Sequence, residues 1–105
     1  MKVAITSTGE SLDSMIDPRF GRCAFFAIHD TEKNRTEFIA NPAKNSLEGA
    51  GPAAVQFIVG YKVDKIVSVE FGMKIKPILE SLHIEMVTNK EATSKIADII
   101  ELYQY

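Results

Sequence analysis

The sequence predicts an α/β fold of three layers, in which three helices cover the two faces of a five-stranded sheet. In the second half of the chain, short apolar runs alternate with segments of helical spacing, and such strand-helix-strand units give parallel strands. In the first half, two strand-like runs are separated only by the polar residues 31–34, a gap typical of a hairpin. We therefore expect a mainly parallel sheet whose second and third strands are antiparallel.

Strands are expected at residues 2–7, 23–30, 35–40, 64–69 and 84–88. The first is a short apolar run that is closed by a turn-rich stretch of serine, threonine and glycine. The second is too short and too aromatic to favour a helix, and the third completes the hairpin. The fourth and fifth lie between helical segments.

Helices are expected at three places. The first begins at Pro52 and ends before Gly60, because proline suits the first turn of a helix and glycine the position after its end. The second lies within residues 73–82 and is short, since Pro77 is tolerated only in a first turn. The third follows residues 88–91, whose Thr-x-x-Glu spacing resembles a capping box. Its apolar residues at helical spacing are Ile96, Ile99, Ile100 and Tyr103.

The composition indicates a single domain, residues 1–105, with its own hydrophobic core. Twelve lysine and arginine residues against 14 aspartate and glutamate residues leave no large basic surface for nucleic acid. No apolar run approaches the roughly 18 residues that cross a bilayer, so we expect a cytoplasmic protein without membrane association. Cys23 is the single cysteine, so a metal bound here needs further ligands from the bound group, a partner or a second subunit.

The loop that precedes the second strand concentrates unusual chemistry. Arg19 and Arg22 offer planar cationic donors for an anion, and a neighbouring positive charge would lower the pKa of the Cys23 thiol. This pattern indicates an anion site or a metal-cluster site. In the structural alternative, Cys23 simply starts a buried strand while the arginines bind carbonyl groups or pair with Asp13 and Asp17.

A glycine-rich segment, residues 49–54, opens the first helix and matches the Gly-x-Gly-x-x-Ala form of a dinucleotide fingerprint. Glu70 lies 19 residues beyond Gly51, as that fingerprint requires. A dinucleotide site, however, needs its glycines directly after a strand, and residues 41–48 intervene here. The glycines either let the backbone turn closely past the arginine loop or add N–H groups as a secondary anion contact.

The remaining polar residues favour structural roles. His83 stands where a helix commonly ends in left-handed geometry, and His29 is either structural or faces the same pocket as the arginines. Neither histidine has the spacing of a metal motif. The sequence contains no Gly-x-Ser-x-Gly elbow, and the first strand carries no carboxylates for two metal ions, so we expect no hydrolase or nuclease activity.

Four segments together resemble the dinitrogenase iron-molybdenum cofactor biosynthesis family: residues 17–22, Asn41-Pro42, residues 49–51 and Phe71-Gly72. The resemblance implies a ribonuclease-H-like α/β/α fold with a mixed sheet, in which the second strand is antiparallel to the first. It also implies binding or carrying of iron-sulfur cofactors. In cofactor-carrying members a histidine, the favoured cofactor ligand, often occupies the position that Arg19 holds here.

From the loop chemistry and this resemblance we expect a non-catalytic binding or carrier protein for an anionic cluster of the iron-sulfur or iron-molybdenum type. Its partners would be proteins that donate or accept the cluster. The alternatives are a small nucleotide- or phosphate-binding enzyme and a protein-interaction domain without a small ligand. The expected binding residues are Arg19, Phe20, Gly21, Arg22, Cys23, Gly49 and Gly51, with Cys23 as the metal ligand.

Overall fold

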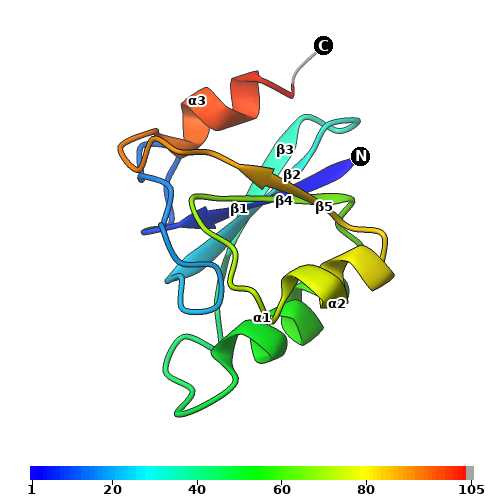
Figure 1. Ribbon diagram of the computed structural model, residues 1–105. Helices are drawn as coiled ribbons and strands as arrows, with labels where there is room; N and C mark the ends of the chain where they lie inside the picture. The colour runs from blue at the N-terminus through cyan, green and yellow to red at the C-terminus, as the bar shows by residue number, and fades with distance from the viewer. Residues whose placement is uncertain (104–105) are drawn as a thin grey trace.

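A computed structural model describes residues 1–103, and its five strands and three helices follow in the predicted order (Figure 1). The alternation of strand and helix in the second half of the chain is thus confirmed. The strands are β1 (Lys2–Ser7), β2 (Phe25–Asp30), β3 (Arg35–Ala40), β4 (Lys65–Ser68) and β5 (Glu85–Thr88). The helices are α1 (Ala50–Val59), α2 (Lys76–Ser81) and α3 (Ile96–Glu101).

The strands form one mixed sheet in the order β3-β2-β1-β4-β5. β2 is antiparallel to both β1 and β3, whereas β4 is parallel to β1 and to β5. Ile5 lies at the centre, opposite Ala27 of β2 and Val67 of β4. The expected antiparallel pairs and the mixed sheet are confirmed, while the ribonuclease-H-like description stays a prediction. The expectation of a mainly parallel sheet is wrong, because β2 is antiparallel to both of its neighbours and only two of the four strand pairs are parallel.

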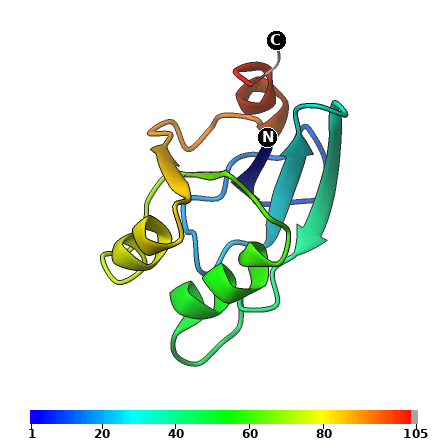
Figure 2. The same ribbon diagram turned by 90° about the vertical axis from the view of Figure 1, so that its right-hand side faces the viewer.

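The three helices cover the sheet from opposite sides. Figure 2 shows α1 and α2 on one side of the sheet and α3 on the other. A hydrophobic cluster lies on each face of the sheet, and β1 contributes to both because neighbouring residues of a strand point to opposite faces. Ala4 packs in the cluster beneath α1 and α2, whereas Val3 and Ile5 pack in the cluster beneath α3. None of the helices within residues 1–103 is long and apolar enough to span a bilayer.

Helix α1 begins at Ala50, two residues before the predicted start at Pro52. Two further predicted boundaries are wrong, and both errors come from contacts between distant segments. The second strand begins at Phe25 rather than at residue 23, because the Ala24 N–H donates to the Asp17 carboxylate (3.2 Å). The capping box at 88–91 does not start α3. Thr88 still belongs to β5, opposite Ser68 of β4, and the helix begins only at Ile96.

His83 ends the α2 segment in left-handed geometry, as predicted, with φ of 58°. Its N–H donates to the Glu80 carbonyl (3.1 Å), and the side chain is exposed. We expect His83→Val to lower the free energy of unfolding by about 1 kcal/mol, because a β-branched residue tolerates positive φ poorly. His83→Gly should match or slightly exceed the wild type. Urea unfolding of the three proteins tests this, and equal stability of His83→Val would contradict it.

Candidate functional site

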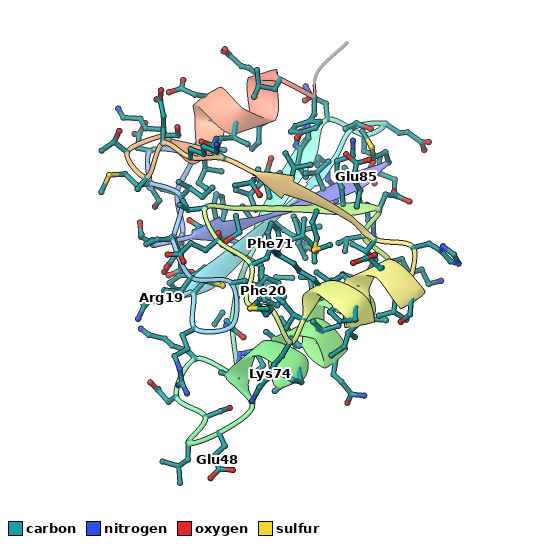
Figure 3. The ribbon with its side chains drawn as sticks, in the orientation of Figure 1. Arg19, Phe20, Glu48, Phe71, Lys74 and Glu85 are labelled. Atoms are coloured by element: carbon teal, nitrogen blue, oxygen red, sulfur yellow. The ribbon has the colours of Figure 1, made fainter. Side chains whose placement is uncertain are left out.

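A cleft of about 580 Å³ opens between three segments at one end of the sheet. They are the loop between β1 and β2, the first turn of α1, and the segment that joins β4 to α2 (Figure 3). Cys23 is not among the lining residues. The cleft brings together six of the seven predicted binding residues: Arg19, Phe20, Gly21, Arg22, Gly49 and Gly51.

The arginine loop and α1 are in direct backbone contact. A Cβ atom added to Gly21 would lie 2.7 Å from the Gly51 nitrogen and 2.8 Å from its Cα. A Cβ atom on Gly51 would in turn lie 2.8 Å from Cγ2 of Ile75, in the segment before α2. The three walls of the cleft therefore meet closely at Gly21 and Gly51, where a Cβ atom would force a neighbouring group to move. This geometry agrees with the expectation that the glycines let the backbone turn closely past the arginine loop.

The glycine-rich segment lacks the geometry of a dinucleotide fingerprint. Gly49 has φ of 65° and stands at the N-cap of α1, which is preceded by the turns of residues 41–48 and not by a strand. The dinucleotide interpretation fails in this respect, since the fingerprint needs a strand that runs directly into the glycines. Glu70 lines the same cleft from the opposite wall.

Asp17 shapes the loop from within. Its side chain is buried, and its two carboxylate oxygens accept hydrogen bonds from different parts of the loop. Oδ1 accepts from the Arg19 backbone N–H (3.1 Å) and from Arg19 Nε (3.4 Å), while Oδ2 accepts from the Ala24 N–H (3.2 Å). Both ends of the loop are thereby tied to one carboxylate. The expected pairing with Asp17 is confirmed, whereas Asp13 has no ion-pair partner among the described residues.

Asn41 holds the same loop from the other side and was not predicted as a site residue. Its Nδ2 donates to the carbonyl oxygens of Gly21 and Cys23, both at 3.0 Å, and its Oδ1 accepts from the Ala43 N–H at 3.0 Å. The side chain is buried, so no water competes for these bonds. An Asn-Pro pair directly after a strand is the sequence signal that could have indicated this role.

Three cationic side chains and one carboxylate line the cleft. The Arg19 side chain is 61% exposed, and Lys74 is exposed on the opposite wall. Arg22 is partly buried because its Nη1 donates to the carbonyls of Lys44 (3.2 Å) and Ser46 (2.8 Å). Its remaining N–H groups stay available for a ligand. With Glu70 as the opposing charge, the cleft carries a net positive charge.

Phe20 anchors the loop in the core. Its ring is 3% exposed and lies 5.8 Å from the ring of Phe26 and 6.0 Å from that of Phe71, measured between centroids. Phe20 and Phe71 are seen together between the sheet and the helices in Figure 3. This aromatic contact joins two walls of the cleft. The buried ring of Phe20 therefore fixes the loop, and the neighbouring Arg19 side chain extends into solvent.

Cys23 lies behind the cleft, with no exposed surface and with Sγ 3.6 Å from Asn41 Nδ2. Burial, and after it the charge of Asp17, raises the pKa of the thiol from 9.0 to about 12. The expected lowering by the arginines is wrong, because Arg19 acts against these larger effects. A thiol held protonated is a poor metal ligand. Within residues 1–103 no group of three or more His, Cys, Asp or Glu side chains could hold a metal ion. Ligation by Cys23 stays a prediction, and this geometry lends it no support.

The sequence of the whole chain, residues 1–105, matches a family model described as dinitrogenase iron-molybdenum cofactor. The chain belongs to this family. An uncharacterized protein of Methanocaldococcus jannaschii is 30% identical to it over 98% of this chain and 89% of the relative. The resemblance that the loop, Asn-Pro and glycine segments indicated is thereby confirmed.

Two solved structures share the fold of this dinitrogenase iron-molybdenum cofactor family member. The apo form of the orange protein from Desulfovibrio gigas is 25% identical, with a TM-score of 0.89 over 97% of this chain and 85% of that chain. A proposed NifB protein from Thermotoga is 28% identical, with a TM-score of 0.82 over the same shares of the two chains. The mixed five-stranded sheet with three helices is therefore a shared architecture.

Proposed function

We propose that this protein is a non-catalytic carrier of an anionic metal-sulfur cluster of the iron-sulfur or iron-molybdenum type, bound as cargo in the cleft. The observation that carries the proposal is the convergence of Arg19, Arg22 and Lys74 on a cleft of about 580 Å³, in a chain of this family. That volume falls within the range of roughly 300 to 1,000 Å³ of small-ligand sites.

The cleft suits recognition of an anion by charge and hydrogen bonds. Guanidinium groups donate several hydrogen bonds in a fixed plane, and the N–H groups of Ala50 and Gly51 in the first turn of α1 add donors that have no intrahelical partner. Backbone contact between Gly21 and Gly51 holds the loop and this helix end together. Binding without thiolate ligation leaves the cargo free to exchange, which is what a carrier requires.

Arg19 stands at the position where cofactor-carrying members of the family often have histidine. An arginine cannot ligate iron, but it can hold an anionic cluster through charge-assisted hydrogen bonds. Its partly free guanidinium, steadied by Asp17 at 3.4 Å, is placed for this role. We infer that the cluster is recognised here as an anion, and that donor and acceptor proteins exchange it through the open mouth of the cleft.

The test is anaerobic titration with isolated iron-molybdenum cofactor, and with tetrathiomolybdate as a simple anion of molybdenum and sulfur. Arg19→Gln and Lys74→Gln should each weaken binding by about tenfold, the effect of one lost charge-assisted contact. Lys90→Gln removes the same charge from an exposed residue that does not line the cleft, and should bind as the wild type does. Equal weakening by all three variants would refute specific recognition in the cleft.

The variant Arg19→His should change the binding of the two anions in opposite senses. The imidazole supplies a neutral nitrogen ligand suited to iron, so the iron-molybdenum cofactor should bind more tightly while tetrathiomolybdate should bind more weakly. Tight binding of ATP at the cleft, with hydrolysis that Arg22→Ala abolishes, would instead favour the nucleotide-handling enzyme. Absence of binding for every anion would favour the protein-interaction domain.

A further inference from the structure

A second cleft, of about 480 Å³, lies on the other face of the sheet, between the β2-β3 hairpin and α3. Figure 2 shows that α3 lies across the sheet from α1 and α2, and the first turn of α1 lines the cleft described above. Apolar side chains from three segments line much of it: Leu12, Phe38, Ala97 and Ile100. The residues of this α3 cleft are entirely different from those of the first cleft.

His29 on β2 also lines the α3 cleft and carries an unsatisfied polar atom. The side chain is 2% exposed, and Nδ1 forms a hydrogen bond with Oγ1 of Thr36 (2.8 Å). Nε2 is buried and has no hydrogen-bond partner among the described residues 1–103. Buried polar atoms of native proteins are nearly always hydrogen-bonded, so an orphaned nitrogen beside a cleft indicates a missing partner.

The protonation state of the His29 imidazole determines which hydrogen-bonding groups the missing partner must have. Burial lowers the pKa of His29, opposed in part by the Asp30 carboxylate, so the ring is neutral at pH 7. A neutral imidazole presents Nε2 as an acceptor or as a donor, depending on which way the bond with the Thr36 hydroxyl runs. A hydroxyl group satisfies both tautomers, because it donates and accepts. The apolar walls favour a ring or chain of carbon atoms behind that hydroxyl.

We propose that the α3 cleft binds a small uncharged apolar molecule that carries a hydroxyl group, with the hydroxyl on His29 Nε2 and the apolar body against Leu12, Phe38 and Ile100. Nε2 is buried in this structure, so a ligand reaches it only when the side chains that cover it move aside. An anion is disfavoured here, since the imidazole is neutral and Glu101 lines the cleft. The two clefts therefore select different chemistry.

Phenol and toluene form a matched pair of probes, since they differ only by a hydroxyl in place of a methyl group. Titration of ¹⁵N-labelled wild-type protein at pH 7 should show phenol binding that shifts the resonance of His29 Nε2 and the amides of Phe38 and Ile100. Phenol should bind about tenfold more tightly than toluene, the effect of one hydrogen bond. His83, which is exposed at the end of α2, should not respond.

His29→Leu keeps the apolar volume and removes the nitrogen. In this variant phenol should bind no more tightly than toluene, because its hydroxyl has no partner in the cleft. The wild-type titration decides the proposal even if His29→Leu does not fold. Three results would overturn the proposal: equal binding of phenol and toluene to the wild type, resonance shifts confined to Gly21 and Gly51, or no response to phenol. The last requires titration up to about 10 mM phenol, a concentration at which so small a ligand should bind.

Discussion

Alkylation of Cys23 by iodoacetamide at pH 8 is expected to be about a thousand times slower in the folded protein than in the urea-unfolded chain. The thiolate is the reactive form, and raising the pKa from 9.0 to about 12 lowers its population by about three powers of ten. The complete burial of the side chain adds to the protection. Mass spectrometry of timed samples at one pH measures both rates. If Cys23 in the folded protein were alkylated at a rate within tenfold of that in the unfolded chain, the raised pKa would be contradicted and Cys23 could again serve as a metal ligand.

The same pKa predicts a specific alkaline loss of stability. The folded pKa of Cys23 is raised above the unfolded value, so the thiol contributes fully below pH 9 and its contribution is lost as the pH rises from 9 to about 12. The complete loss is about 4 kcal/mol, of which about 1 kcal/mol falls before pH 10. Cys23→Ala is the control, because it lacks the titrating group. The difference in urea-unfolding free energy between wild type and this variant should therefore shrink between pH 8 and pH 10, whereas a constant difference would contradict the raised pKa.

Gly21→Ala should be the most damaging small substitution at the cleft lined by Arg19 and Lys74, lowering the free energy of unfolding by about 3 kcal/mol. The added Cβ would lie 2.7 Å from a backbone nitrogen of α1, at Gly51, and no flexible side chain can yield there. The loop must then move away from the helix. We expect weaker binding of the iron-molybdenum cofactor together with the lower stability, measured by anaerobic titration and urea unfolding.

Gly72→Ala is the matched control for this prediction. Gly72 lines the same cleft, but a Cβ atom there meets nothing within 4 Å. Its stability should stay within about 0.5 kcal/mol of the wild type, as for most surface substitutions. If Gly21→Ala and Gly72→Ala were equally stable, the close approach of loop and helix would not be what holds the cleft together.

The site residues that lie close together in the sequence could be predicted without the structure. Arg19, Arg22 and the glycines at the start of α1 could be singled out because anion-binding residue types cluster within a few positions. Lys74 was missed because it lies between the apolar residues Met73 and Ile75 in a segment without a recognisable motif, and only the fold places it across the cleft from Arg19. Asn41 was noted as part of a family pattern but not as the residue that ties the loop down, since its partners lie 18 and 20 residues away.

The sequence by itself determined the order of the elements, the hairpin, the short α2 with its proline and the left-handed His83, because each depends on the local chain. Only the tertiary structure decided where β2 and α3 begin, since the hydrogen bond to Asp17 and the pairing of β5 with β4 come from segments far apart. It also decided the chemistry of Cys23. Two nearby arginines in the sequence predict a lowered pKa, but loss of water around the thiol is a property of the packed core and acts more strongly in the opposite direction.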